Sequence, residues 1–387
     1  MNKKKRVLML ADADSFWTQR NLEYLLLPEG YEVVLFPIWG NGHRYDAFYA
    51  EKGVHVYRDA HALPVIRYIP RLRMWVRIAF NARDLKRLGP FDIVHNHYLS
   101  QRDLALGGRL ARSFGATWAC SFWGSDLLRA DERALAKMKP YLDRCDAISV
   151  HSELSRELIR RAYGDAVAKK TTVLYFGQMG YGDIDRVRRT HTKGDCKTHF
   201  GIDPGRFVVC VGYNASSAQQ QLPVLEAMQS MPGELLRRVT LVLQQTYGEN
   251  DPDYVRRVRE CAGRLPCQTV VFTRFMDATE SALLRLAADV FILAIKTDAF
   301  SASMQEYLYA GACVLKAAWL GYPQLDDMGI TLPEFNEFSE LPALIIRAFN
   351  SEINGLSEAQ RALFPRLYSW DAVRGSWLSL YGKLACA

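Results

Sequence analysis

The sequence lacks any uninterrupted apolar run close to the ~20 residues that a membrane-spanning helix needs. Its first residues, MNKKKRVLMLADAD, place aspartates where a secretory signal peptide would continue its apolar region. The eight cysteines are scattered and include no CxxC pair, which suits reduced thiols better than a disulfide framework. We therefore expect a cytoplasmic protein with no metal and no cofactor.

The length and composition of the chain predict two domains. With 387 residues it exceeds the roughly 250–300 residues at which a single core stops growing. Apolar residues make up 49% of the chain and charged residues 24%, as in ordinary soluble proteins. The formal charge of +7 is modest, so the location of the cations is more informative than their total.

The cations concentrate in residues 64–88, PVIRYIPRLRMWVRIAFNARDLKRL, where seven basic residues face a single acid, Asp84. From Pro70 onward this pattern predicts a basic amphipathic helix, a type that lies on anionic membranes. Arg71, Arg73 and Arg77 would then contact the inner face of the plasma membrane. The alternative is the solvated face of a helix packed on a sheet. Nucleic acid is not expected as a partner, because no binding module accompanies the cations.

Short apolar runs alternate with helical stretches twice along the chain, as parallel sheets covered on both faces require. The first set is KRVLML, YEVVLF, FDIVHNH, TWACSF, AISVHS and TTVLYF, and the second is FVVCVGY, VTLVLQQ, TVVFTRF, DVFILAI and ACVLKAA. The pattern predicts an α/β protein with two doubly wound Rossmann-like domains facing an interdomain cleft. We place the domains at residues 1–185 and 186–365, with a last helix over 366–387.

The stretch TDAFSASMQEYLYAG follows the apolar strand DVFILAI directly. We expect a loop and then a helix whose first turn contains Ser301, Ala302 and Ser303. The backbone N–H groups of a first turn have no partner within the helix and form a natural site for a diphosphate.

Two carboxylates, Asp298 and Glu306, lie on either side of that first turn in the sequence. Carboxylates accept hydrogen bonds from vicinal hydroxyls, so they suit a nucleotide sugar. For Glu306 there is a purely structural alternative, because Ser303 followed three residues later by Glu306 also has the spacing of a capping box.

The stretch DAFSASMQEYLYAG resembles the signature of the retaining family 4 of GT-B glycosyltransferases, two glutamates separated by seven residues and followed by a glycine-ended helix. Asp298 takes the place of the first glutamate, Phe300 matches the phenylalanine of the signature and Ser301 takes the place of its second glycine. Glu306 is the second glutamate, and Gly311 ends the helix. FDIVHNHY, SFWGSD and YSWDAVRGSWLSLY resemble other segments of the family, so the likeness spans most of the chain. The C-terminal helix is then expected to cross back to the first domain.

The resemblance implies roles for these residues. Glu306 would hold the ribose hydroxyls, Asp298 the transferred sugar and the amides of 301–303 the diphosphate. Metal independence is usual in GT-B enzymes. Family members supply an arginine and a lysine after the first strand of the second domain, whereas Asn214 and either Gln219 or Gln220 stand in that loop here.

Other residues could replace these missing cations, and other positions also depart from the family. Arg274, or Lys296, could supply the charge from a neighbouring strand end. Trp123 stands where the family has a histidine, and Asp12 lies in a glycine-poor loop after the first strand, where it could serve the acceptor.

The loop VGYNASSAQQQL and the later QQTYGEN also look like segments of bacterial transferases that add N-acetylfucosamine to a lipid-linked precursor and invert the anomeric centre. By that likeness Tyr247 and Asn250 would line the donor site together with Gly212 and Asn214, although Tyr-Gly is equally a turn composition. An inverting enzyme needs a general base, for which His97 is the first candidate by position, followed by Asp126 and Asp12.

The sequence thus predicts a metal-independent glycosyltransferase that moves a sugar from a nucleotide-diphosphate sugar to a lipid-linked or surface-glycan acceptor in bacteria. Two other classes remain open. One is a GT-B nucleotide-sugar 2-epimerase, and the other is a non-catalytic nucleotide- or glycan-binding protein on the same scaffold.

Overall fold

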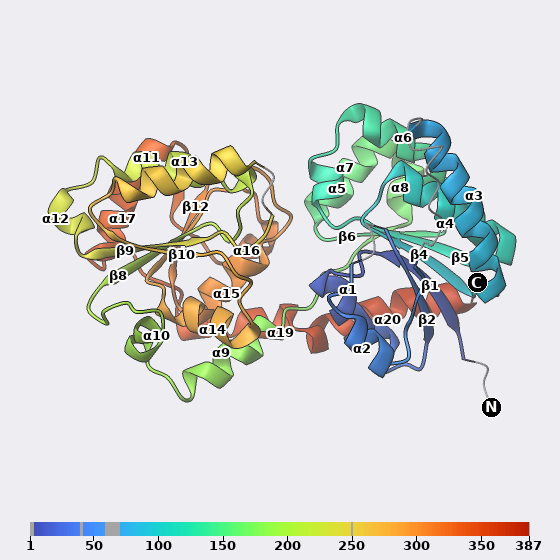
Figure 1. Cartoon of the computed structure of the whole chain (residues 1–387), viewed down its shortest axis with the longest axis horizontal. Helices are drawn as coiled ribbons and strands as arrows, with labels where there is room; N and C mark the ends of the chain where they lie inside the picture. The colour runs from blue at the N-terminus through green and yellow to red at the C-terminus, as the bar shows by residue number, and fades with distance from the viewer. Residues whose placement is uncertain (1–3, 39–41, 59–69, 249–250, 387) are drawn as a thin grey trace. The chain divides into compact units, whose positions relative to one another are not determined.

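The computed structural model describes residues 4–38, 42–58, 70–248 and 251–386, with the side chains of 70–75 and 77 left outside the description. The chain forms two compact units (Figure 1). The first comprises Met1–Gly177 together with Trp370–Ala387, and the second comprises Gln178–Ser369. The chain therefore changes unit after residues 177 and 369, where the sequence analysis places the boundaries after 185 and 365.

The first unit is built on a parallel sheet with the strand order β3-β2-β1-β4-β5-β6-β7. The five strands between the two edge strands are almost fully buried, because helices cover both faces. The strands are β1 (Arg6–Ala11), β2 (Glu32–Pro37), β3 (His55–Val56), β4 (Ile93–His97), β5 (Thr117–Ser121), β6 (Ala147–Val150) and β7 (Thr171–Val173).

The helices of the first unit divide between the two faces of this sheet (Figure 1). One face carries α3 (Pro70–Leu88), α4 (Gln101–Phe114), α5 (Ser125–Leu128), α6 (Glu132–Leu142), α7 (Glu153–Tyr163) and α8 (Asp165–Lys169). The other carries α1 (Phe16–Asn21), the π-helical turn η1 (Leu22–Leu26), α2 (Asp46–Glu51) and α20 (Trp370–Cys386).

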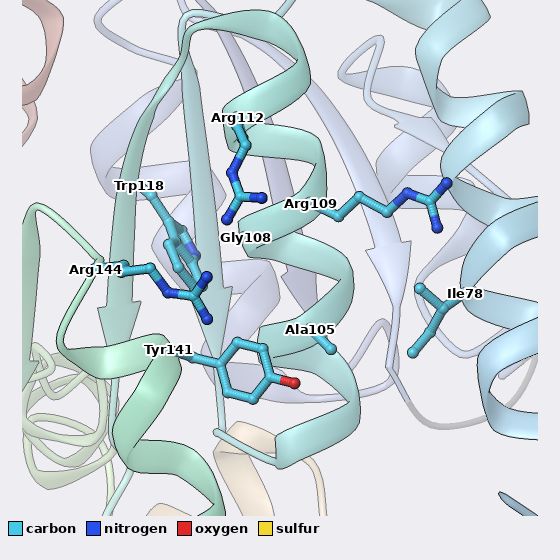
Figure 2. A pocket seen from close by; sticks show the side chains of 8 residues that line it. All are labelled: Ile78, Ala105, Gly108, Arg109, Arg112, Trp118, Tyr141 and Arg144. Carbon is cyan, nitrogen blue, oxygen red and sulfur yellow. The ribbon is translucent and has the colours of Figure 1, made fainter.

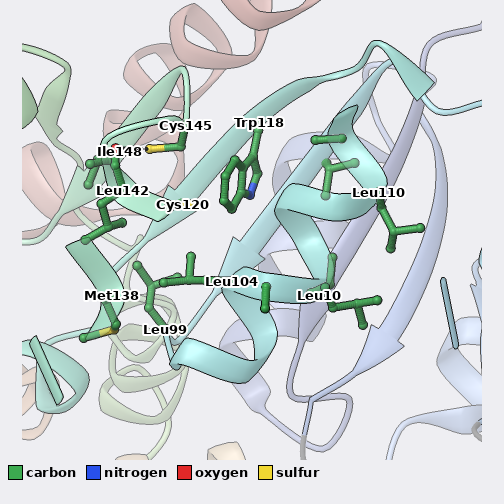
Figure 3. Close-up of a cluster of buried hydrophobic side chains, with 14 of the residues drawn as sticks. Leu10, Leu99, Leu104, Leu110, Trp118, Cys120, Met138, Leu142, Cys145 and Ile148 are labelled. Carbon is green, nitrogen blue, oxygen red and sulfur yellow. Dashed lines mark hydrogen bonds between the residues drawn. The ribbon is translucent and has the colours of Figure 1, made fainter. Parts of the chain in front are cut away.

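A hydrophobic cluster fills the space between the sheet and α3, α4 and α6 (Figure 3). It includes Leu10 from β1, Leu104 and Leu110 from α4, Trp118 from β5 and Leu142 from α6. Glycine allows α4 to approach the sheet, since a Cβ at Gly107 would lie 2.0 Å from Oδ1 of the β4 residue Asn96. The close packing of α4 on β4 and β5 fixes that face of the unit.

The C-terminal helix α20 completes the first unit from the far end of the chain. Trp377 is fully buried and donates from Nε1 to the carbonyl oxygen of Tyr175 at 2.7 Å. The hydroxyl of Tyr381 lies 2.7 Å from Nδ1 of His95 on β4. The expected return of the last helix to the first domain is therefore confirmed.

The second unit has a parallel sheet with the strand order β10-β9-β8-β11-β12-β13. Its strands are β8 (Phe207–Val211), β9 (Val239–Gln244), β10 (Gln268–Phe272), β11 (Val290–Leu293), β12 (Cys313–Ala317) and β13 (Glu334–Phe335). Each strand predicted from the sequence is present in one of the two sheets. The two-residue strands β3 and β13 were not predicted, because a pair of residues carries no periodic pattern.

The second unit is also covered on both faces (Figure 1). The helix α11 (Gln221–Met228) packs with α13 (Pro252–Gly263) and α17 (Leu341–Phe349), while α14 (Ala278–Ala287) packs with α9 (Gly180–Arg188), α10 (Lys193–His199) and α15 (Ala302–Ala310). Shorter segments are α12 (Gly233–Leu236), α16 (Pro323–Asp327), α18 (Glu358–Arg361), α19 (Leu363–Tyr368), and the 3-10 turns η3 (Ser217–Gln219) and η4 (Phe338–Glu340).

None of the helices within the described residues is both long enough and apolar enough to span a membrane. The predicted amphipathic helix is present as α3, from Pro70 to Leu88. The side chains of Arg71, Arg73 and Arg77 lie outside the described part of the chain, so their contact with a membrane stays a prediction.

Candidate functional site

The loop after β11 leads into α15 at the carboxyl edge of the second sheet. Ser301 caps the helix, its Oγ accepting from the backbone N–H of Met304 at 3.2 Å, and Gly311 ends it with φ of 102°. The alternative in which Ser303 forms a capping box with Glu306 is wrong, because Ser303 lies inside the helix. Within the described residues, the N–H groups of Ala302 and Ser303 have no acceptor. They are open to an anion.

Asp298 lies in the loop directly before this helix and is already held by its neighbours. Its Oδ2 accepts from the hydroxyl of Tyr322 at 3.0 Å, and its Oδ1 accepts from the N–H of Ala299 at 2.9 Å. The ring of Phe300 packs edge-on against Tyr322 at 5.6 Å. The tyrosine therefore fixes both the carboxylate and the aromatic residue that the sequence placed at the donor site.

Glu306 lies on α15 and faces Arg285, which projects from α14. Arg285 is 6% exposed and donates from Nε to Oε2 of Glu306 at 3.1 Å. Its guanidinium also donates to the Tyr307 hydroxyl at 3.0 Å and to Oε1 of Gln244 at 3.3 Å. Gly180 leaves room on the other side, since a Cβ there would lie 2.4 Å from Oε1 of Glu306.

This arrangement sets the charge of Glu306. Burial raises the pKa of Glu306, and the Arg285 charge beside it acts in the opposite direction. Burial also works against the charge of Arg285, but Tyr307 and Glu306 keep its pKa above the usual value. The side chain of Glu306 stays 20% exposed, so a carboxylate paired on one side still has an open edge for a ligand hydroxyl.

The β8 loop holds the amides that stand where the family has cations. Gly212 has φ of +64°, and a Cβ there would lie 2.9 Å from Oε1 of Gln219. That same oxygen accepts from the N–H of Tyr213 at 3.3 Å, while Nε2 of Gln219 is buried with no partner among the described residues. Gln219 therefore shapes the loop, and its amide supplies no positive charge.

Asn214 and Tyr247 come together at this edge, as their shared assignment to the donor site requires. The N–H of Ala215 donates to the carbonyl oxygen of Tyr247 at 2.8 Å. Tyr247 is 49% exposed, and its hydroxyl lies close enough to Arg285 and Glu306 for their charges to act on it. Asn250, which the sequence also assigns to the donor site, lies outside the described residues. The β8 and β9 loops thus meet near the start of α15.

The two cations offered by the sequence as replacements have different surroundings. Arg274 forms a double contact with the carboxylate of Glu280, and its side chain is 72% exposed. Lys296 follows β11, its side chain is exposed, and its Nζ has no partner within the described residues. The arrangement favours Lys296 over Arg274 as the cation available to a diphosphate at α15.

The first unit gathers buried histidines at the carboxyl edge of β4–β6. The Trp123 indole donates to Nδ1 of His97 at 3.1 Å, so the neutral ring carries its proton on Nε2. Burial keeps the pKa of His97 well below its usual value, with His95 and His151 adding to the effect. His97 is therefore placed as a hydrogen-bond donor, which argues against the predicted role as general base.

Asp126 is also committed to the structure, which argues against its predicted catalytic role. Its carboxylate accepts from the backbone N–H of Leu99 at 2.7 Å, Trp123 at 2.8 Å and Gly124 at 3.0 Å. Burial raises its pKa to about 6. Asp12, in the loop after β1, accepts from the N–H of Asp14 at 3.0 Å and is likewise part of a turn.

The sequence analysis did not single out Arg285, His151 or Tyr322. The only available signal for Arg285 was one cation inside the apolar stretch SALLRLAADVF. A charge in such a stretch needs a buried partner, but the partner lies 21 residues later on another helix. Among the described residues, no group of three or more histidines, cysteines or carboxylates is arranged to hold a metal ion.

Comparison with known proteins identifies the fold. Residues 19–177 match the family described as "Glycosyl transferase 4-like domain". A glycosyltransferase from Rickettsia africae superimposes with a TM-score of 0.75 at 15% identity, over 99% of this chain and 99% of that one. HepE of Anabaena, solved with UDP and glucose, gives 0.73 at 15%, over 98% and 100%. Sucrose-phosphate synthase from Thermosynechococcus elongatus gives 0.72 at 15%, over 99% and 100%.

No curated protein sequence matches the chain. At these identities the structural likeness establishes the fold, which is GT-B, as the sequence analysis predicted. The match to the glycosyltransferase 4-like family lies within the first unit.

Proposed function

We propose that this chain is a glycosyltransferase that binds a nucleotide-diphosphate sugar at the carboxyl edge of the second sheet. The observation that carries the proposal is the start of α15, where the free N–H groups of Ala302 and Ser303 lie between Asp298 and Glu306 in the chain. The glycosyltransferase 4-like match and the GT-B relatives, one of them solved with UDP and glucose, support the same reading.

The chemistry assigned to these groups is the stabilisation of a leaving diphosphate. When the bond between the sugar's anomeric carbon and the diphosphate oxygen breaks, negative charge builds on that oxygen. The helix N–H groups and the Lys296 ammonium would stabilise this charge. Glu306 would hold the ribose hydroxyls and Asp298 the sugar, while Asn214 and Tyr247 would border the nucleotide.

The first unit is proposed to serve the acceptor. The proposed acceptor is a glycan or lipid-linked intermediate of a bacterial surface polymer, consistent with the basic helix α3 as a peripheral membrane contact. His97 would donate its Nε2 proton in a hydrogen bond rather than remove a proton, and Trp123 would hold it in that state. The retaining outcome and the likeness to N-acetylfucosaminyl transferases remain predictions from the sequence.

The donor class is tested by thermal shift with UDP, GDP, dTDP and CMP and their sugar conjugates. We expect one nucleoside diphosphate to raise the melting temperature, since a ligand at 100 times its Kd adds about 2.7 kcal/mol to the stability of the folded state. Glu306→Gln keeps an oxygen for Arg285 but removes the charge that holds the ribose. It should weaken binding by about tenfold.

The matched control is Glu280→Gln, which removes a carboxylate of the same unit that pairs with Arg274. The rise in melting temperature that each nucleotide causes in this variant should equal the rise in the wild type. A melting temperature that no nucleotide changes would contradict the proposal. Binding without release of a diphosphate would indicate a non-catalytic protein, and conversion of the sugar without an acceptor would indicate an epimerase.

A further inference from the structure

A second pocket lies in the first unit, away from the proposed donor site (Figure 2). It has a volume of about 340 Å³ and opens between α3, α4 and the end of α6. Its lining residues are Ile78, Ala105, Gly108, Arg109, Arg112, Trp118, Tyr141 and Arg144. The volume is within the range of small-molecule sites, and the lining combines three arginines with two aromatic rings.

The apolar floor of this pocket is held in place by specific contacts. Gly108 lets the Trp118 ring lie against α4, since a Cβ at that position would be 2.6 Å from Cη2 of the indole. The indole Nε1 donates to Oδ1 of Asn96 at 2.8 Å, and the backbone N–H of Trp118 donates to Asp146 at 2.7 Å. The buried Trp118 is therefore a rigid surface on which an apolar group can rest.

The positive charge around the floor is not balanced by acids. Within the described residues, the exposed guanidinium groups of Arg109 and Arg112 have no ion-pair or hydrogen-bond partner. Arg144 packs over the Tyr141 ring at 5.6 Å, and its one donation within the described part of the chain runs from Nε to the carbonyl oxygen of Pro140 at 2.7 Å. Figure 2 shows Arg112 and Arg144 reaching from α4 and from the end of α6, with Arg109 extending toward α3.

The nearby carboxylates have other partners. Asp143 receives the Lys139 ammonium at 2.8 Å, and Asp146 receives the Trp118 N–H. Other exposed arginines of the same unit have acidic partners, as Arg160 and Arg161 have in Glu157. The pocket therefore carries an excess of positive charge.

The pocket lies at the opposite edge of the sheet from the buried histidines. Trp118 is the second residue of β5, Arg112 is in the last turn of α4, and Arg144 follows the end of α6. These positions mark the amino ends of the strands, whereas His97 and Asp126 lie at or beyond their carboxyl ends. A ligand here would not compete for the edge where parallel sheets bind substrates.

We propose that this pocket is a binding site for a phosphate ester that carries an apolar or aromatic group. Arginine forks match the several oxygens of a phosphate, and the indole and phenol rings face the apolar part of the ligand. The inference goes beyond the proposed sugar transfer and does not depend on it, because no lining residue belongs to the donor site. The same chemistry is offered by a soluble phosphate ester and by a phospholipid headgroup.

Calorimetric titration with phenyl phosphate tests whether the ligand is a soluble phosphate ester. Co-sedimentation with phosphatidylcholine vesicles, with and without phosphatidic acid, tests whether it is a phospholipid headgroup. Wild type is expected to bind in one of these two experiments. Arg112→Ala/Arg144→Ala should weaken that binding by about tenfold or more, since two charge-assisted contacts are lost. Arg237→Ala/Arg264→Ala removes the same charge from exposed positions of the second unit and should leave the affinity within about twofold.

Three results would overturn the proposal. These are no binding by wild type in either arm, an equal loss in the two double variants, or unchanged binding in Arg112→Ala/Arg144→Ala with a lower melting temperature. The last would show that the arginines only stabilise helix ends. Nucleotide binding at the second unit should be the same in all three proteins, which separates this test from that of the donor site.

Discussion

Replacing Arg285 by methionine is expected to destabilise the second unit by about 3–5 kcal/mol, because it leaves Glu306 without its partner in a largely buried position. The hydroxyl of Tyr307 and the amide oxygen of Gln244 lose the same donor. Methionine fills a similar volume, so the loss reflects unsatisfied polar groups more than a cavity. Urea unfolding followed by circular dichroism measures the change.

Arg274→Met provides the matched control for this prediction. Arg274 also pairs with a glutamate in the second unit, but its side chain is 72% exposed. Exposed pairs contribute between about 0 and 1 kcal/mol, so the control should lose much less stability. Equal losses in the two variants would show that the Arg285 network does not stabilise the unit in the way its contacts indicate.

Mild acid is expected to unfold the first unit, because it contains three buried neutral histidines. Burial lowers the pKa of His95 to about 3 and that of His151 to about 4, and it lowers the pKa of His97 well below its usual value. In the unfolded chain each ring titrates near pH 6.5. Below that pH the unfolded state therefore binds more protons than the folded state, and stability falls as the pH falls.

The expected loss of unfolding free energy per pH unit follows from the difference in the number of protons bound by the unfolded and the folded states. Each ring contributes up to about 1.4 kcal/mol per pH unit, and this contribution develops as the pH falls through about 6.5 and the unfolded chain takes up its protons. Burial raises the pKa of Asp126 to about 6, so the folded state takes up one proton there over the same range and offsets one of the three. A net difference of two protons remains near pH 5, which gives about 2.7 kcal/mol per pH unit.

Urea unfolding at a series of pH values from about pH 7 to about pH 5 tests this expectation. His151→Gln should reduce the slope near pH 5 by about half, because one of the two net protons is lost, whereas replacing the exposed His191 of the second unit should leave it unchanged. A first-unit stability that stays constant over this range would contradict the assignment of neutral, buried rings.

Local patterns predicted most of the fold. Runs such as VLML in β1 and VFIL in β11 are apolar throughout because helices cover both faces of each sheet, and the sequence shows this directly. The two-residue strands β3 and β13 contain no such pattern. These short strands form because the neighbouring strand has unpaired backbone N–H and C=O groups along its edge. That edge is present only once the sheet has assembled.

The site could be predicted from the sequence where its residues lie close together in the chain. The loop and helix after β11 place Asp298, Ser301 and Glu306 in one short stretch whose order can be read from the sequence. Long-range pairing was not readable. Neither the contact of Arg285 with Glu306 nor the indole bond that fixes the proton of His97 follows from spacing, since both join separate elements.

The most direct test of the donor site is calorimetric titration of the nucleoside diphosphate that gives the largest thermal shift. Wild type is compared with Lys296→Ala and Arg274→Ala. Because Lys296 is unpaired within the described residues beside the start of α15, its loss should weaken binding by about tenfold. Arg274, held by Glu280, should be replaceable with less than about a twofold change. Unchanged affinity in Lys296→Ala, or a loss confined to Arg274→Ala, would contradict the placement of the diphosphate at α15.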